Sequence, residues 1–180
     1  MLLERGGVPV LVEGPLDALA ITTAGQGRYV GLAPLGTALT EEQAHQVAAL
    51  AHPWGAAPVV AADADTAGRQ VTDLAYWLLT QHGLSPAAVA WQPGSGPADT
   101  LTRHGRPALR QALEIANPLA QHLLDQRLAR VVGLEALRRS VAVVAAGSPD
   151  LWSSTPRRSP TPPTCPCPWC AATAPTTRAR

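Results

Sequence analysis

Three acidic residues directly follow apolar runs in the first half of the chain. Glu13 comes immediately after the run at residues 8–12, and Asp63 and Asp65 come immediately after the run at residues 58–62. Both runs are short, contain β-branched residues and end at turn-forming residues, a pattern that predicts buried strands. In an open parallel α/β sheet, binding sites form outside the carboxyl ends of the strands. The sequence therefore predicts that these carboxylates meet at one edge of a sheet.

Clustered carboxylates repel one another, and at least one is pushed toward protonation unless a cation neutralises them. Carboxylate oxygen is a hard ligand that favours Mg²⁺ or Mn²⁺, so the pattern is compatible with a divalent-metal site for phosphate chemistry. A simpler interpretation is also open. A Glu-Gly pair after a strand is often only a turn, and an Asp-x-Asp before a helix is often an N-cap with a solvated neighbour.

The rest of the pattern alternates between strands and helices, which predicts an α/β fold. We expect about four mainly parallel strands with helices on both faces, followed by C-terminal helices. Thr40 and Gln43 resemble a capping box at the start of one helix. Strands are predicted at 8–12, 29–33, 58–62 and 88–91, a loop at 93–97, and helices at 16–23, 41–51, 67–82, 106–116, 118–130 and 134–146.

Composition divides the chain into three parts: a domain at 1–116, a helical extension at 117–147 and a disordered tail at 148–180. Residues 151–180 hold 7 Pro, 6 Thr and 4 Arg with no acid and no apolar periodicity, whereas the first 150 residues carry 10 Arg against 13 acids. All three Cys lie in the tail, so we expect no disulfide framework. The net charge of +1 gives no overall basic footprint for nucleic acid.

The chain shows no apolar run of about 18 residues that could span a membrane, and no signal-peptide pattern at its start. We therefore expect no membrane partner and a cytoplasmic location. The five histidines share no common spacing and are expected to be surface or satisfied residues. The basic stretch Arg103, Arg106 and Arg110 is expected to be a solvated face rather than a nucleic-acid contact.

Four segments, in order and well spaced, resemble the Toprim domain of the bacterial DNA primase family. The segment around Glu13 and Asp17 resembles the first Toprim motif, and Asp63 to Arg69 resembles the Asp-x-Asp motif in its primase form, with Ala67 where topoisomerase versions usually carry Glu. The other two are the Leu-Gly-Thr segment at 35–40 and the later acidic segment at 97–101. One departure is Gly96, because primase-like sequences usually carry Asp at that position.

The resemblance implies a Toprim fold and assigns roles to individual residues. Asp63 and Asp65 would ligate Mg²⁺ or Mn²⁺, and Glu13 would act as general base or acid or contact the metal. The supporting residues would be Asp17 and Asp99 at the rim, with Gly14 and Gly68 in backbone turns beside the site.

The resemblance also implies Mg-dependent nucleotidyl transfer, which makes RNA primers on single-stranded DNA from nucleoside triphosphates. Bacterial primases carry a zinc-binding module and a basic subdomain ahead of the Toprim domain. Only seven residues precede the first strand run here, so we expect a fragment whose partners would be a helicase or the missing primase modules. Two alternatives stay open: a non-catalytic accessory or remnant domain, and a Toprim nuclease. The Leu-Gly-Thr segment and Ala67-Gly68 argue against the nuclease.

Overall fold

The computed structural model describes residues 2–34, 39–130 and 134–147. The Leu-Gly-Thr segment at 35–37, Gly36 included, falls outside these ranges, as do the tail at 148–180 and its three Cys. The fold below therefore concerns the Toprim-like segment and the helical extension.

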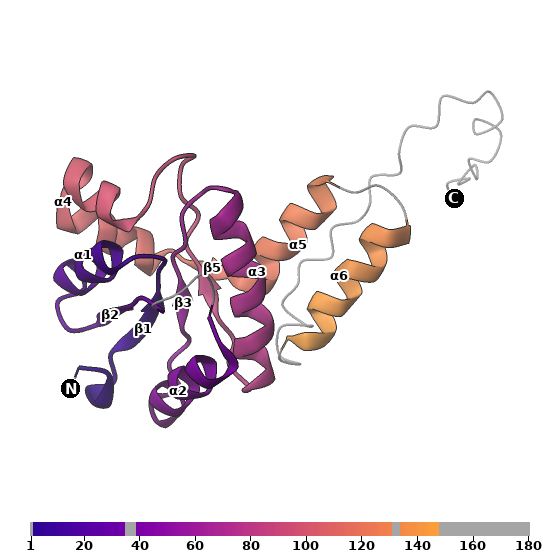
Figure 1. Cartoon of the computed structure of the whole chain (residues 1–180), viewed down its shortest axis with the longest axis horizontal. Coiled ribbons are helices and arrows are strands. Elements are labelled where there is room, and N and C mark those ends of the chain that lie inside the picture. The colour runs from indigo at the N-terminus through magenta and orange to yellow at the C-terminus, as the bar shows by residue number, and fades with distance from the viewer. Residues whose placement is uncertain (1, 35–38, 131–133, 148–180) are drawn as a thin grey trace, which may run out of the picture.

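A five-stranded sheet in the order β2-β1-β3-β4-β5 forms the centre of the structure (Figure 1). The first four strands are parallel, and β5 runs antiparallel to β4. The register places Val10 beside both Gly31 and Val59. The strands are β1 (Val8–Leu11), β2 (Tyr29–Leu32), β3 (Val59–Val60), β4 (Ala87–Ala88) and β5 (Asn117–Pro118). The mainly parallel α/β sheet is as predicted, but β5 was missed, because two exposed residues that include a proline give no strand signal.

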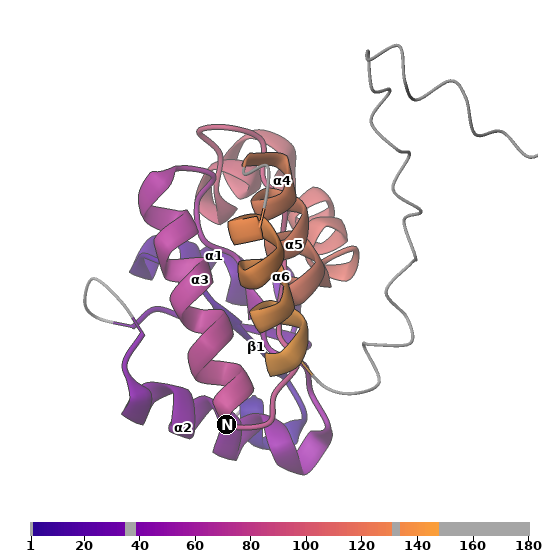
Figure 2. The same cartoon turned by 90° about the vertical axis from the view of Figure 1, so that its right-hand side faces the viewer.

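Six helices cover the two faces of this sheet (Figures 1 and 2). Helices α1 and α4 pack together on one face, and α2, α3, α5 and α6 share the other. Of the described helices, none is long and apolar enough to cross a membrane. The helices are α1 (Pro15–Gly25), α2 (Glu41–Ala51), α3 (Thr66–Gln81), α4 (Pro97–Glu114), α5 (Leu119–Arg130) and α6 (Leu134–Ala146), with short 3-10 turns η1 (Leu3–Arg5) and η2 (His52–Trp54).

Successive side chains of the strands point to opposite faces of the sheet and pack in two separate hydrophobic cores. Val10 of β1 is fully buried against α1 and α4, whereas its neighbour Leu11 is buried on the other face. The second core extends into the helical extension, since Leu123 of α5 and Val143 of α6 belong to it. The hydroxyl of Tyr76 in α3 donates a hydrogen bond to the carbonyl of Val143. The extension therefore packs against the same side of the sheet as α3.

The start of α2 follows the predicted capping box. Thr40 Oγ1 accepts a hydrogen bond from the Gln43 amide at 3.2 Å, and the Thr40 amide donates to Gln43 Oε1 at 2.9 Å. These two bonds satisfy backbone donors that the first turn of a helix leaves without partners. The prediction of this helix start is confirmed.

Helix α4 differs from the prediction, which placed a helix only from residue 106. The structure has helical turns from Pro97, followed by a break at Gly105 (φ 80°, ψ 176°). Pro97 and Pro107 each stand at the start of a helical segment, where the missing N–H costs nothing. Pro107 cannot continue an uninterrupted helix, and the positive φ of Gly105 lets the chain turn into the second segment. The glycine and proline pattern hid the first segment from the sequence prediction.

Candidate metal-binding site at the carboxyl edge of the sheet

The predicted carboxylates lie where the strand order reverses. The chain leaves β1 to form β2 on one side and then crosses to form β3 on the other side. This switch point, at the carboxyl ends of β1 and β3, is where open α/β sheets place their ligands. Glu13 follows β1 and Asp63 follows β3, so both lie at the crevice.

Glu13 links the two loops directly. Its Oε1 atom accepts a hydrogen bond from the Asp63 amide at 2.9 Å, across 50 residues of sequence. The structure therefore brings these two sequence-predicted residues together.

Asp63 carries the clearest electrostatic signature of the site. Its pKa is raised from the usual value of 3.8 to about 6, first by burial and then by the charges of its acidic neighbours. In decreasing order of effect, those neighbours are Asp17, Glu13, Asp65 and Asp99. All of the other predicted acidic residues thus lie within electrostatic reach of Asp63.

Asp65 has the structural role that the simpler interpretation assigned to it. It is the N-cap of α3, where its Oδ1 atom accepts a hydrogen bond from the Gly68 amide at 2.8 Å. The residue is solvent-exposed, so its second carboxylate oxygen can reach a ligand. Capping α3 and contributing negative charge to Asp63 are therefore compatible functions of the same side chain.

Asp17 and Asp99 occupy the first turns of α1 and α4. The Oδ1 atom of Asp17 accepts a hydrogen bond from the Ala98 amide at 3.0 Å. Ala98 lies in the first turn of α4, whose own N-cap is Gly96 and has no side chain to offer, so Asp17 caps α4 from another helix. Asp99 forms an ion pair with Arg103 at 3.0 Å, and its influence on Asp63 is the smallest of the four acids.

Two glycines permit close approaches at the site. A Cβ atom on Gly68 would lie 2.1 Å from the Asp63 carbonyl oxygen and 2.8 Å from Glu13 Oε1. A Cβ atom on Gly96 would lie 2.1 Å from Asp63 Oδ1, so the Asp63 carboxylate fills the space beside Gly96. Gly14 has ordinary extended backbone (φ −119°), and its conformation does not demand glycine. Glycine therefore matters most at Gly68, through close packing rather than through the turn that was expected.

The donor chemistry of this edge suits a hard divalent cation. Among the described residues, no three His, Cys, Asp or Glu side chains form a ready-made ligand set. Mg²⁺ does not require one, because it keeps several water molecules and commonly uses one or two protein carboxylates. The pKa of Asp63 is raised by burial and by neighbouring negative charge, and a bound cation would offset both effects by favouring the ionised carboxylate. The residues thus fit a water-rich site centred on Asp63 better than an all-protein cage.

Comparison with known families agrees with this geometry. A match to the Toprim-like family covers residues 10–101, the segment that contains the end of β1, all of β3 and all five predicted acidic residues of the site. The chain belongs to the Toprim-like family.

Similar sequences are bacterial DNA primases. The chain is 28% identical to the DNA primase of Clostridium acetobutylicum over 139 residues, which are 77% of this chain and 22% of that protein. It is 30% identical to the DNA primase of Aquifex aeolicus over 122 residues, which are 68% of this chain and 23% of that protein. This Toprim-like chain therefore spans about a fifth of the length of the curated relatives that it matches.

Solved primase structures share the fold of this Toprim-like chain. The RNA polymerase domain of the Mycobacterium tuberculosis primase DnaG superposes with a TM-score of 0.69 at 25% identity, covering 84% of this chain and 50% of that one. The zinc-binding and RNA polymerase domains of the Aquifex aeolicus primase give 0.65 at 25% identity, covering 83% and 35%. The resemblance to primase Toprim domains is confirmed.

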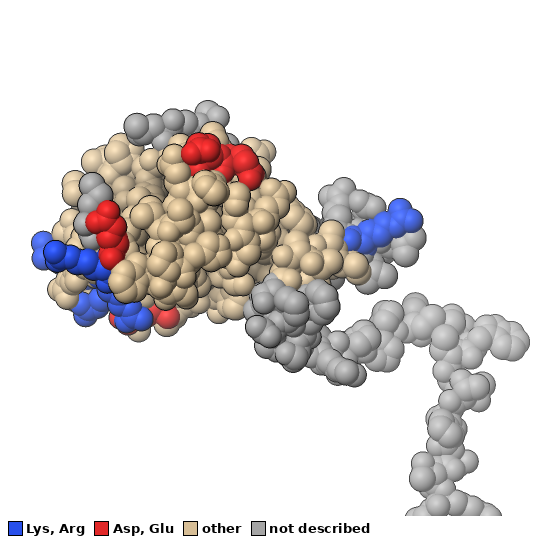
Figure 3. Space-filling view, turned by 90° about the horizontal axis from the view of Figure 1, so that it is seen from below, with Lys and Arg blue, Asp and Glu red and all other residues tan. Residues whose placement is uncertain are grey.

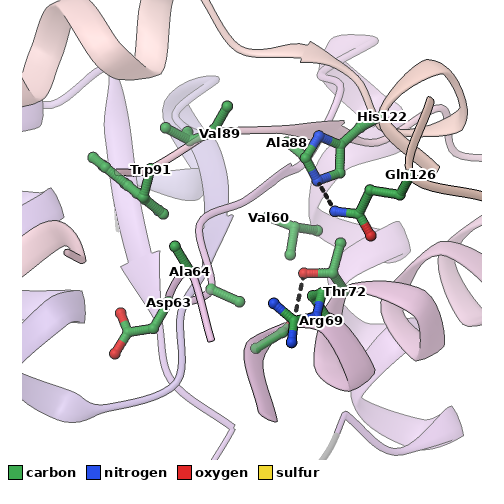
Figure 4. A pocket seen from close by; sticks show the side chains of 13 residues that line it. Val60, Asp63, Ala64, Arg69, Thr72, Ala88, Val89, Trp91, His122 and Gln126 are labelled. Carbon is green, nitrogen blue, oxygen red and sulfur yellow. Dashed lines mark hydrogen bonds between the residues drawn. The ribbon is translucent and has the colours of Figure 1, made fainter. Parts of the chain in front are cut away.

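Sequence reasoning missed a cavity of about 190 Å³ beside Asp63 (Figure 4). Arg69, Trp91, His122 and Gln126 line it, and they come from three different parts of the chain. His122 and Gln126 are four residues apart on α5, so the helical period could have paired them. Their meeting with the ends of β3 and β4 depends on tertiary structure.

The basic residues of α4 were predicted to form a solvated face. Seen from the side of α2, the described surface is mostly uncharged, with one acidic group standing apart and a second place where acidic and basic side chains lie together (Figure 3). On α4, Arg103 is paired with Asp99, and Arg110 Nη1 donates to Gln26 Oε1 at 3.2 Å. Arg103 and Arg110 thus each have a polar partner, and the solvated face stays a prediction.

Proposed function

We propose that this chain is the metal-binding domain of a primase-type nucleotidyltransferase, and that it takes part in Mg²⁺- or Mn²⁺-dependent synthesis of RNA primers on single-stranded DNA. The observation that carries the proposal is the group of carboxylates around Asp63, whose pKa is raised to about 6 first by burial and then by these like charges. When bound, the metal would neutralise the phosphates of a nucleoside triphosphate and lower the barrier to attack by a hydroxyl group.

Each acidic residue of the site has a separate role in this proposal. Asp63 and Asp65 hold the metal, Asp63 from the crevice and Asp65 through the carboxylate oxygen that does not cap α3. Glu13 keeps one oxygen on the Asp63 amide at 2.9 Å and uses the other to accept the proton of the attacking hydroxyl or to contact the metal. Asp17 positions α4, and Asp99 supports the rim.

Nucleic acid and further protein parts complete the proposal. The Mycobacterium tuberculosis primase RNA polymerase domain has been solved in complex with double-stranded DNA, with a TM-score of 0.64 and 25% identity to this chain. This chain covers 50% of that domain. We propose that other primase modules supply the surface that holds the template, that a helicase is a further partner, and that the protein acts in the cytoplasm.

A primer-synthesis assay on single-stranded DNA, with nucleoside triphosphates and Mg²⁺ or Mn²⁺, tests the proposal. Combined with the primase modules that hold the template, the wild-type chain should make short RNA products. Asp63→Asn or Glu13→Gln should lower the rate by about 100-fold or more, as expected for groups that act on developing charge. Glu42→Gln on α2 is the matched control, because it removes one exposed carboxylate that neither lines the cavity nor acts on the pKa of Asp63, and it should leave the rate unchanged.

A second candidate is a non-catalytic Toprim domain that binds metal without making primers. Gly96, the Asp99–Arg103 ion pair and the lack of a ready-made ligand set among the described residues favour it. In this case, Mg²⁺ would raise the melting temperature of the wild type but not of Asp63→Asn, and neither protein would make a product. Cleavage of the DNA in the same reactions would identify a nuclease instead. Failure of both metals to bind would reject all three functions.

A further inference from the structure

The cavity beside Asp63 has one apolar wall and one polar end. Val60, Ala88 and Val89, at the ends of β3 and β4, supply much of the apolar wall, and Trp91 extends it. At the other end, Figure 4 shows the imidazole of His122 and the amide of Gln126 facing each other from α5, with 2.7 Å between Nε2 of each.

The polar groups of this cavity are suited to hydrogen bonding rather than to binding charge. Burial lowers the pKa of His122, so the ring is neutral near pH 7 and offers one donor and one acceptor nitrogen. Gln126 adds an amide that can donate and accept. In the described part of the chain, the indole N–H of Trp91 is buried without a hydrogen-bond partner, an arrangement that costs free energy unless an acceptor is brought to it.

The size and position of the cavity narrow the class of ligand. About 150 Å³ of apolar cavity accepts a benzene ring, so about 190 Å³ has room for a heteroaromatic ring. Asp63 lies on the rim and disfavours an anion inside the cavity. Arg69 also lines it, and in the described residues its guanidinium has no carboxylate partner, donating only to Thr66 Oγ1 at 2.7 Å. A ligand with a neutral planar ring and an anionic end that points toward the metal would match these groups.

We propose that this cavity binds the base of the nucleotide whose phosphates lie at the carboxylate edge. The inference rests on the proposed function, because that function places a nucleoside triphosphate beside Asp63. The base lies against the apolar wall of the sheet and turns an edge that does not pair with the template, such as N6 and N7 of adenine, toward His122 and Gln126. Arg69, which also lines the cavity, contacts the phosphates.

Calorimetric titrations of the whole chain with Mg²⁺ separate the base from the phosphates. The probes are the four nucleoside triphosphates and inorganic triphosphate, which has no base. At least one nucleotide should bind about 10-fold more tightly than inorganic triphosphate, the scale expected for one good amide-to-base contact. Gln126→Leu and His122→Leu should remove most of this advantage and leave the affinity for inorganic triphosphate unchanged.

Two further variants distinguish loss of the cavity contacts from a general effect on α5. Gln121→Leu makes the same substitution on the same helix at a residue that bonds Asp125 and does not line the cavity, so it should keep the full advantage. Ala90→Leu offers a second route if the α5 variants do not fold, because Ala90 is exposed at the cavity and a larger side chain there would narrow it. Equal binding of nucleotides and inorganic triphosphate by the wild type, or an advantage that survives both kinds of variant, would overturn the inference.

Failure of the proposed function gives a different result. In that case, Mg²⁺ would not promote binding of inorganic triphosphate, and Asp63→Asn would change nothing. Base binding by the cavity is then measured by titrating the chain with uncharged nucleosides in the presence of a chelator. Binding that Gln126→Leu weakens and Gln121→Leu preserves would support a base-binding cavity, and no binding of any nucleoside would reject it.

Discussion

The two ends of α3 differ in how their charged side chains are arranged. At its start, Asp63, Asp65 and Glu13 bring negative charges together, and the pKa of Asp63 rises to about 6. At its end, the Nε2 atom of His82 lies 2.8 Å from Glu41 Oε1, and His52 Nε2 lies 2.8 Å from the His82 carbonyl oxygen. One end accumulates like charges, whereas the other pairs each group with a complementary one.

The difference indicates that the start of α3 serves ligand binding, whereas its end serves stability. The positive end of the α3 dipole partly offsets the carboxylates at its start, but it does not remove their mutual repulsion. Such strain is retained where a ligand can relieve it. The paired end has no comparable excess of charge, and it serves to fix α3 against α2. His52 fits the expectation that the histidines are satisfied residues, whereas among the described residues the buried His82 Nε2 makes no well-formed hydrogen bond despite its approach to Glu41.

The largest effect is expected for Gly68→Ala at the start of α3. The new methyl group would lie 2.1 Å from the Asp63 carbonyl oxygen, and a backbone atom cannot move aside cheaply. We expect a loss of about 2–3 kcal/mol in the free energy of unfolding, together with loss of Mg²⁺ binding. Urea denaturation with and without Mg²⁺ measures both effects.

Gly14→Ala is the control, because a methyl group there meets only the Asp17 carboxylate, at 3.3 Å. It should cost about 0.5 kcal/mol, through the poorer N-cap. Equal losses in the two variants would show that close packing at Gly68 has no special role.

A smaller effect, of opposite sign, is expected from Asp63→Asn. Because the folded state raises this pKa from 3.8 to about 6, it holds a proton that the unfolded chain has released between those values. The wild type should therefore lose stability as the pH rises through this window, and the variant should not. The full shift would be worth about 3 kcal/mol, but solvent screening reduces the expected gain of the variant at pH 8 to about 1 kcal/mol.

Thermal melts from pH 4 to pH 8 measure this dependence, and Mg²⁺ should cancel the advantage of the variant above pH 6. Parallel curves for the two proteins at every pH would mean that the carboxylates do not repel one another. Such a result would remove the contrast between the two ends of α3.

The smallest effect should come from Glu41→Gln at the paired end. The Glu41 side chain is 60% exposed, so its contact with His82 should contribute no more than about 0.5 kcal/mol. The loss should shrink in high salt. Glu42→Gln, which changes the exposed neighbour that bonds Gln46, is the control and should be nearly neutral. A loss above about 2 kcal/mol would show that this end holds more energy than its exposure allows.

Much of the site could be predicted because it follows from local patterns. Apolar runs that end in Glu13 and Asp63 identify both strands and the edge at which they end. The cavity near His122 could not be predicted, because it depends on how α5 packs against residues far away in sequence. Asp17 was recognised as acidic and near the site, but its bond to Ala98 required the position of α4. Long-range contacts of single side chains leave no periodic signal in one sequence.

The break at Gly105 divides α4 into two parts with different constraints. Asp17 holds the first part by its opening turn, so this part keeps a fixed relation to the carboxylates. The second part is anchored elsewhere, through the fully buried Leu109 in the core beneath α1. Because helical hydrogen bonding is interrupted at Gly105, the direction of the first part does not dictate that of the second. Substitutions in the core around Leu109 should therefore reach the carboxylate edge less directly than substitutions in the first turn of α4.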